Sequence, residues 1–449
     1  MTRHILFFIF RLLARFRLPR TAAYLLLLTS RKLPTFPSSA QSNHRRRALI
    51  MTRVGFSQDI EQSFGGTDAF ELIAWPSYTL KAFSAAILSP SLDHNNYLTK
   101  DAAAEASKAE YRQFLAELWK VFRHLKPTDV VITGNFAYFT EREFAAALEN
   151  VGTPFIALHK ENVRPPKRVK EYWHNVYKDR RGEFSGRKIL VYNNVERDLE
   201  ISSGIADADR IVVTGMPRLD KIHRWRHDHA GSVNGEVRPL VLFFAFSRQD
   251  KLTAIQRKPT AGLPGNMEDM DGEWGKLSWT RLGDSTHQTI VNLARSRPDI
   301  QVIVKSKGQR RKQNDILEML KDAGDLPPNL SVVTGGDPFG LITSSRVVIG
   351  FNTTGLLEAV AAGKPVIVPW FGEAADDRMR EHIIDLGKAV EYAHSPAELA
   401  AMICRHTDNP TKVPLELAPD AAETLRYWVG NDDGKAGMRV LEAIRQEVR

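Results

Sequence analysis

The feature that most limits the folds open to this chain is a series of unbroken apolar runs. Segments with the spacing of apolar residues typical of helices separate these runs. The first half contains "DVVITGN" (129–135), "PFIALHKE" (154–161), "KILVYNN" (188–194) and "RIVVTGMP" (210–217). Strands that are buried on both faces carry such continuous Val, Ile and Leu runs, and the helices between them make the strands parallel. The first half is therefore predicted to be an α/β domain with a parallel sheet.

A second series of the same kind begins at "PLVLFFAFS" (239–247). It continues through "IQVIVKSKG" (300–308), "LSVVTG" (330–335), "RVVIGFN" (346–352) and "PVIVPWF" (365–371). We therefore expect two Rossmann-like domains, each with a parallel sheet. The predicted boundaries are an arm and linker at 1–47, an N-terminal domain at 48–236, a C-terminal domain at 237–420 and a C-terminal helix at 421–449.

The positive charge of the chain is confined to the arm. The formal net charge is +9, but residues 1–47 alone carry ten Lys and Arg and no acid, which leaves 52 basic and 53 acidic residues in the remainder. Nucleic-acid binding needs a basic face on a folded domain, so we expect no nucleic-acid partner. A basic arm on a neutral body favours an anionic membrane surface instead.

The arm is apolar in two short runs, Ile5–Phe10 and Ala22–Leu28. Neither approaches the roughly 20 apolar residues of a spanning helix, and Pro19 interrupts any continuous helix between them. The pattern predicts two amphipathic segments within residues 1–32 that lie in a membrane interface, followed by a linker at 33–47. A transit or signal peptide, and a helix packed on the protein's own body, are the alternatives.

The carboxyl ends of parallel strands are where ligands bind in such sheets. In the second half this rule selects Ser247 and Arg248, then Lys305, as candidates for phosphate binding. Lys307 alternates with Lys305 along the same strand end, so only one of the two faces the cleft.

The segment "GFNTTGLLEAVAAGKP" (350–365) ends one strand and begins a helix. Its polar turn can cap that helix, and the free amides of the first helical turn form an anion site. Gly350 and Gly355 are expected to allow close approach of the backbone to a ligand. Glu358 lies about one turn into the helix, where its carboxylate can accept hydrogen bonds from a ribose diol. The residues predicted to bind the donor here are Asn352, Thr353, Thr354, Gly355 and Glu358.

Three segments carry a resemblance to a known group. "NTTGLLEAVAAGKPVIVP" (352–369) resembles the donor-binding segment of GT-B glycosyltransferases. "VVTGMPRLD" (212–220) and "FIALHKE" (155–161) are similar to segments of bacterial surface-polysaccharide transferases and CDP-glycerol glycerophosphotransferases. The resemblance spans residues 129–373. It departs from the glycerophosphotransferases in lacking a His-Pro after "VKSKG" and in having His159-Lys160 in place of His-Gly, which favours a sugar donor over glycerol phosphate.

The resemblance implies the GT-B arrangement, with two domains facing each other across a cleft, the donor on the C-terminal domain and the acceptor on the N-terminal one. Transfer then needs a base for the acceptor hydroxyl, for which His159 and Glu161 are the candidates. No metal and no cofactor beyond the nucleotide-sugar co-substrate are expected, because helix amides and basic side chains can carry the phosphate charge. Arg218 and Asp220 either act in the site or form a salt bridge that fixes the hinge.

The leading hypothesis is a peripheral membrane glycosyltransferase at the cytoplasmic face of the inner membrane. It would transfer a sugar from a nucleotide donor to a glycan or lipid-linked glycan in capsule or lipopolysaccharide biosynthesis. The alternatives are a sugar-nucleotide 2-epimerase, a CDP-glycerol-type glycerophosphotransferase and a non-catalytic assembly subunit.

Overall fold

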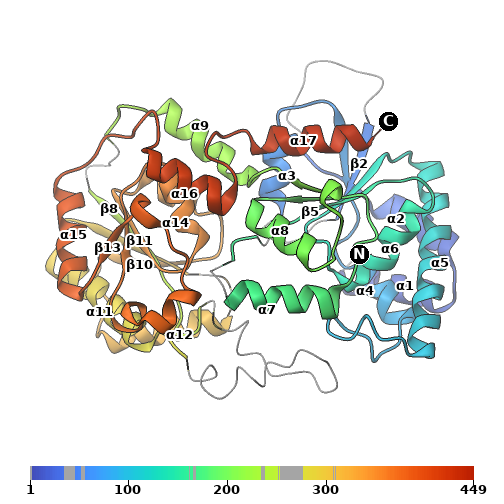
Figure 1. Cartoon of the computed structure of the whole chain (residues 1–449), viewed down its shortest axis with the longest axis horizontal. Coiled ribbons are helices and arrows are strands. Elements are labelled where there is room, and N and C mark those ends of the chain that lie inside the picture. Colours follow the sequence, from blue (N-terminus) through green and yellow to red (C-terminus); the bar gives the residue numbers. More distant parts are fainter. Residues whose placement is uncertain are drawn as a thin grey trace.

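Two parallel sheets, each flanked by helices, form the two lobes seen in Figure 1. The computed structural model describes residues 3–34, 46–51, 56–160, 162–164, 168–233, 238–250, 252, 277–306, 308 and 310–448. The expected fold class, two Rossmann-like α/β domains, is confirmed.

The N-terminal sheet has seven strands in the order β1-β3-β2-β4-β5-β6-β7. β1 pairs antiparallel with β3, and all other neighbours are parallel. The sequence analysis did not predict β1 or β3. The strands are β1 (Arg31–Lys32), β2 (Arg46–Ile50), β3 (Phe70–Ala74), β4 (Val130–Thr133), β5 (Phe155–Leu158), β6 (Lys188–Val191) and β7 (Ile211–Val213).

The C-terminal sheet has six parallel strands in the order β10-β9-β8-β11-β12-β13. The chain adds β9 and β10 on one side of β8 and then returns to add β11 on the other side. The topological switch point, where ligands bind in such sheets, therefore lies between β8 and β11. The strands are β8 (Leu240–Phe244), β9 (Gln301–Ser306), β10 (Leu330–Thr334), β11 (Val347–Gly350), β12 (Val366–Pro369) and β13 (Glu391–Ala393).

The helices follow the predicted periodicity closely where it is long. The longest of them, α5 (Ala102–Leu125), begins after Asp101, whose side chain accepts from the Ala104 amide at 2.9 Å. The N-terminal domain contains α3 (Ser57–Phe64), α4 (Thr79–Ile87), α5 (Ala102–Leu125), α6 (Phe139–Glu149), α7 (Arg168–Val176) and α8 (Asn194–Ser202). The hinge helix α9 (Asp220–Asp228) follows and packs on the C-terminal core through Ile222. The later helices are α11 (Thr280–Ser296), α12 (Arg310–Asp322), α13 (Phe339–Ser344), α14 (Thr354–Ala361), α15 (Pro396–Asp408), α16 (Pro419–Val429) and α17 (Ala436–Glu447).

The arm forms two helices, α1 (Arg3–Arg15) and α2 (Pro19–Thr29), with the chain reversing at Arg17 (φ 53°). α1 packs on α4 and α2 on α5, and the inward side chains of both helices join the core of the N-terminal domain. The inner face of the arm is therefore packed on the protein's own body, as one of the alternatives predicted. Of the predicted linker, Arg46 and Arg47 belong to β2 instead, and residues 35–45 lie outside the described part. In that described part, no helix combines the length and apolarity needed to cross a membrane.

The predicted C-terminal helix is in fact two helices that belong to different domains. α16 buries Leu425 and Val429 in the C-terminal core, whereas α17 buries Val440 and Ile444 against the N-terminal sheet (Figure 1). They separate at Gly430, where φ is 59° and a Cβ would lie 1.8 Å from the Tyr192 carbonyl oxygen. The chain therefore crosses between the domains twice.

The first crossing is held by the two charged residues of "GMPRLD". Arg218 donates to both oxygens of Asp59 on α3, at 3.0 and 2.7 Å. Asp220 accepts from the amides of Ala436 and Gly437, at 3.1 and 2.7 Å, and so binds the start of α17. Arg218 and Asp220 therefore both hold the hinge between the domains, which is the second of the two roles expected for them. Arg218 does so through an ion pair and Asp220 through backbone amides.

Candidate functional site

The start of α14 lies at the switch point of the C-terminal sheet. β11 ends at Gly350 and α14 begins four residues later, with the Thr353 side chain accepting from the Gly355 amide at 3.5 Å. The helix dipole and the free amides of Thr354 and its neighbours point toward the carboxyl edge of the sheet. The capped helix start lies at the expected place, and its role as an anion site stays a prediction.

Asn352 stabilises the protein's own backbone in this structure. It adopts a left-handed conformation (φ 50°), and its side chain donates to the His382 carbonyl at 2.9 Å and accepts from the Ile384 amide at 2.8 Å. The residue therefore ties the β11–α14 turn to the segment that follows β12. Its predicted contact with a donor stays a prediction.

The two glycines of this turn pack against the protein core. A Cβ on Gly355 would lie 2.7 Å from the Phe244 ring, and one on Gly350 would lie 3.0 Å from the Phe244 Cβ. Packing against Phe244 therefore explains these glycines, and the expected approach of a ligand to this turn stays a prediction. They allow α14 to approach the end of β8 across a buried aromatic ring.

Substituting Gly355 with alanine is expected to lower the free energy of unfolding by about 1–3 kcal/mol, because the Phe244 ring must move to admit a methyl group. Urea unfolding measures this loss. The double variant with Phe244→Leu should recover part of it, since leucine leaves room for the methyl group. Additive losses in the double variant would contradict the packing role.

Glu358 is the buried carboxylate that lacks a partner. It is 8% exposed, and in the described part of the chain its carboxylate makes no hydrogen bond or ion pair. Burial raises its pKa to about 7, with nearby Arg218 opposing the rise and Asp337 adding to it. Other buried acids at the domain junction differ, because Asp59 and Asp220 are fully engaged by Arg218 and by backbone amides.

Lys305 lies level with Gly350 in the sheet, because both residues pair with Phe244 of the strand between them. The ammonium group of Lys305 donates to the Gly335 carbonyl, and burial lowers its pKa while Asp337 opposes that shift. Asp337 itself pairs with Lys221 from the hinge helix α9. The structure thus gathers Glu358, Lys305 and the basic hinge residues into one neighbourhood beside α14.

Arg248 and Ser247 lie at the end of β8, as predicted, but Arg248 is engaged elsewhere. Its guanidinium donates to Asp284 at 3.0 Å and to Asp315 at 3.4 Å, which joins α11 to α12. Ser247 is buried. Their roles in phosphate binding stay predictions, and so does the alternative with Lys307, which lies outside the described residues.

A second polar cluster surrounds His159 at the end of β5. His159 Nδ1 lies 2.8 Å from Glu200 Oε1 and 3.5 Å from Glu196 Oε1, and all three side chains are almost completely buried. Arg164 donates to Glu196 at 3.1 Å, and so does the Tyr177 hydroxyl, at 2.6 Å. Glu161, the other predicted base, lies outside the described residues.

The pKa values of the two carboxylates of this cluster are shifted in opposite directions. Burial raises the pKa of Glu200 to about 7, against the opposing effect of His159. Burial acts on Glu196 in the same direction, but Arg164 and His159 outweigh it and hold its pKa below the usual range. A neutral and an ionised carboxyl side by side are what acid–base chemistry requires.

Sequence reasoning did not select Glu200 as a site residue. The signal was available, because Glu196 and Glu200 are four residues apart on a helix that follows a strand, which places both on one face. His159, Glu196 and Glu200 could also offer a metal ion one ligand atom each, within 4.8 Å of one another. Arg164 already brings a positive charge to Glu196, which disfavours a second cation there.

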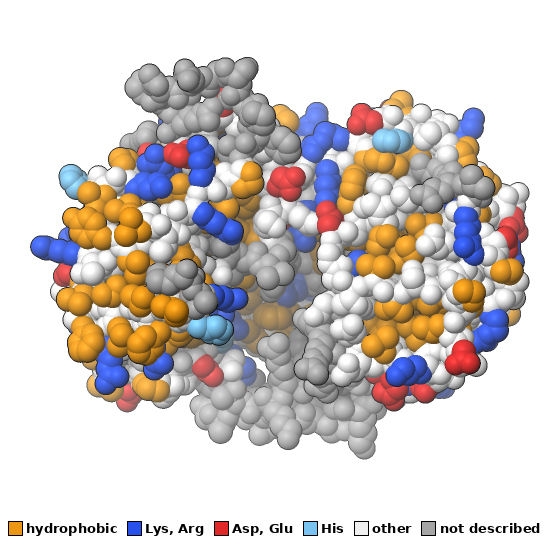
Figure 2. All heavy atoms as spheres, turned by 180° about the vertical axis from the view of Figure 1, so that it is seen from behind, with side chains coloured by type: hydrophobic (Ala, Val, Ile, Leu, Met, Phe, Trp, Pro, Cys, Tyr) orange, Lys and Arg blue, Asp and Glu red, His pale blue; other side chains and the backbone are white. Residues whose placement is uncertain are grey.

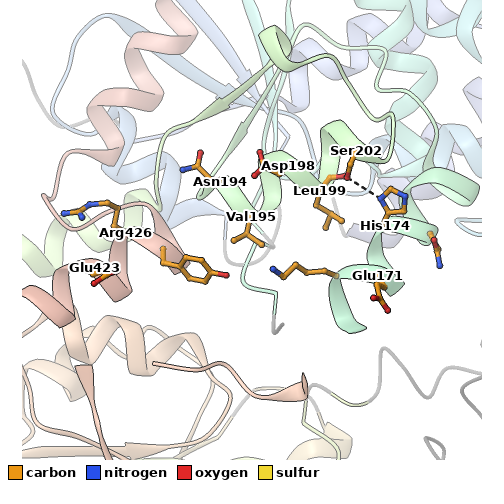
Figure 3. Close-up of a pocket in the computed structure, with 12 residues that line it drawn as sticks. Glu171, His174, Asn194, Val195, Asp198, Leu199, Ser202, Glu423 and Arg426 are labelled. Carbon is orange, nitrogen blue, oxygen red and sulfur yellow. Dashed lines mark hydrogen bonds between the residues drawn. The ribbon is translucent and has the colours of Figure 1, made fainter. Parts of the chain in front are cut away.

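An open cavity of about 1000 Å³ lies on the other face of α8, between α7 and α16. Figure 3 shows Glu171 and His174 on one wall, Asp198 along α8, and Glu423 and Arg426 on the C-terminal side. Its walls come from both domains and carry charges of both signs. None of the predicted donor or catalytic residues is among the described residues that line it.

The comparisons with known proteins find likeness in structure only. No protein-family model and no curated protein matches the chain. A UDP-GlcNAc 2-epimerase from Neisseria meningitidis, bound to UDP-GlcNAc, is 12% identical with a TM-score of 0.47, over 90% of this chain and 100% of that one. A glycosyltransferase from Rickettsia africae is 15% identical with a TM-score of 0.43, over 90% and 99%. The wall teichoic acid polymerase TagF is 11% identical with a TM-score of 0.43, over 73% and 75%.

The structural neighbours are therefore glycosyltransferases and sugar-nucleotide 2-epimerases. They are in keeping with the distant GT-B glycosyltransferase that the sequence resembles. At these identities the likeness concerns the fold.

Proposed function

We propose that the chain binds a nucleotide sugar at α14 and transfers the sugar to a cell-envelope glycan. The observation that carries this proposal is Glu358, a buried carboxylate without a partner at the switch point of a parallel sheet. A ribose diol offers two hydroxyl donors, which would satisfy this carboxylate and favour its charged form. The start of α14 and Lys305 lie at the same edge of the sheet, one on each side of β8, and in this proposal they hold the diphosphate.

The reaction breaks the bond between the sugar and the diphosphate, so the leaving group gains negative charge. Helix amides and Lys305 stabilise that charge on the donor side. On the acceptor side, His159 takes the proton of the attacking hydroxyl, and Glu200 holds the imidazole through Nδ1. This step requires the domains to move, because His159 is buried in this arrangement.

The acceptor in this proposal is a glycan or lipid-linked glycan of the cell envelope, as in capsule or lipopolysaccharide biosynthesis. The cavity between α7, α8 and α16 supports it, since its mixed polar lining suits a polyhydroxylated molecule. The basic arm supports a peripheral location on the cytoplasmic face of the inner membrane.

The proposal is tested with a panel of nucleotide sugars and free nucleotides. We expect one nucleotide class to raise the unfolding temperature of the protein, and the matching nucleotide sugar to release free nucleotide only when a glycan acceptor is present. If no nucleotide changes the unfolding temperature, the proposal fails.

An isomerase that acts on the nucleotide sugar itself is the second candidate. The enclosed His159–Glu200 pair favours it, because proton transfer at a sugar carbon needs a site that excludes water. Product analysis separates the two functions. An isomerase converts the nucleotide sugar into an epimer with no acceptor present, whereas a transferase leaves it intact or slowly hydrolyses it.

A further inference from the structure

The arm has two different faces. Toward the protein, Phe10, Ala14, Ala22, Ala23 and Leu26 are completely buried. Away from it, large apolar side chains reach solvent on both helices, and the most exposed are Leu28 at 84%, Phe16 at 67% and Phe8 at 59%. A helix that only completed the core would have a polar outer face. The outer apolar side chains therefore need another explanation.

The outer residues follow helical spacing. On α1 the apolar row is Ile5, Phe8 and Leu12, and Arg11 and Arg15 run beside it. On α2 the outward row is Arg20, Tyr24 and Leu28, four residues apart. Figure 2 looks onto the side of the molecule where α1 and α2 lie, and shows hydrophobic side chains gathered on this domain with Lys and Arg at their edges. We call these eight residues the outer face of the arm.

The charges on this face stay available to a partner. Arg17 is paired with Glu110 and Lys32 lies near Glu71, but Arg11, Arg15 and Arg20 are exposed and pair with no acid in the described residues. The arm itself contains no acid. Apolar side chains flanked by unpaired arginines complement a surface with anionic headgroups above an apolar layer.

We infer that the outer face of the arm docks on an anionic lipid surface while its inner face stays packed on the N-terminal domain. The inference deepens the peripheral location included in the proposed function. A second copy of the chain is the competing occupant. A two-fold dimer would place the same patch against itself and bring the arginines of both copies together, which costs binding energy.

The test uses the full chain and sedimentation with vesicles of phosphatidylcholine, either alone or with added phosphatidylglycerol. We expect binding to the anionic vesicles that weakens as salt is added. Phe8→Gln with Leu28→Gln should lower the partition coefficient at least roughly tenfold, because two large apolar side chains no longer enter the lipid. Arg11→Gln with Arg15→Gln should cost roughly fivefold per arginine and reduce the salt dependence.

The matched control is Leu415→Gln with Met438→Gln, two exposed apolar residues outside the arm, which should leave binding unchanged. Unaltered unfolding temperatures show that each variant is folded. The inference is overturned if the protein binds neither kind of vesicle, if the Phe8/Leu28 variant binds as the parent does, or if light scattering shows a dimer that this variant abolishes.

Nucleotide-induced stabilisation, measured on the same samples, keeps the two proposals separate. Vesicle binding without any nucleotide effect would sink the proposed reaction and leave the docking surface standing. A nucleotide effect without vesicle binding would overturn the docking surface and leave the proposed reaction standing.

Discussion

Replacing Glu358 with glutamine is expected to weaken nucleotide-sugar binding by roughly tenfold to a hundredfold and to stabilise the protein when no ligand is bound. Hydrogen bonds to a charged group are worth about 1.5–3 kcal/mol each, and the ribose hydroxyls would lose the charged acceptor. The free protein gains because a buried carboxylate without a partner is replaced by a neutral amide. Titration calorimetry and thermal unfolding measure the two effects.

The matched control is Glu143→Gln in the N-terminal domain. Glu143 is also buried, but it accepts from Tyr97 at 2.7 Å and from Arg112 at 2.6 Å. This substitution should reduce stability and leave nucleotide binding unchanged. Equal nucleotide affinity in the Glu358 variant and the parent would remove α14 as the donor site.

The Glu358→Gln variant should also alter how the free energy of unfolding depends on pH. Burial raises the pKa of Glu358 from 4.5 to about 7, so between these values the folded protein retains a proton that the unfolded chain has lost. The stability contributed by this group therefore falls as pH rises through that interval, by about 3 kcal/mol in all. Urea unfolding on either side of the interval should show a larger loss, or a smaller gain, in the parent than in Glu358→Gln. Glu200 adds a similar loss in both proteins, and His223 and His287, whose pKa values burial lowers to about 4, add the opposite change in both.

Removing Asp59 is expected to destabilise the protein by about 3–5 kcal/mol. Asp59 is fully buried and accepts two hydrogen bonds from Arg218 and one from the Tyr192 hydroxyl at 2.8 Å. Asp59→Ala leaves that largely buried guanidinium without its counter-ion, which costs more than the ion pair itself contributes. Urea unfolding gives the magnitude.

Two comparisons define what this loss means. Asp299→Ala removes an exposed partner of Arg297 at the same 2.7 Å distance and should barely change the free energy of unfolding, because water and salt screen that pair. The double variant Asp59→Leu with Arg218→Met removes both charges and should recover much of the stability. A loss for Asp59→Ala no larger than that for Asp299→Ala would show that the hinge pair contributes little.

The sequence predicted the architecture well because buried parallel strands have a strong local signature. Nine strands from β4 to β12 fall within the apolar runs that were selected. The strand β3, "FELIA", and the edge strand β13, "EYA", were missed because each is short and interrupted by a polar residue. Both form only because a neighbouring strand is there to pair with them.

The site was predictable only in part, for physical reasons that differ between residues. Glu358 could be selected because a strand end and a helix start place it by local geometry alone. The hinge pair joins residues 159 positions apart, and no local pattern specifies its partner. The packing of the glycines against Phe244 was not predicted, because a need for small size does not reveal which neighbour imposes it.

The position of α17 has a consequence for the order of assembly during synthesis. The face of the N-terminal sheet that contains Ile50, Leu72 and Ile132 packs in one core with Val440 and Ile444, more than 300 residues later in the chain. The hydrophobic core of the N-terminal domain therefore stays incomplete until the C-terminal domain and then α17 have been translated. A nascent chain halted before α17 should expose an apolar sheet face and be captured by chaperones, whereas one halted after it should not.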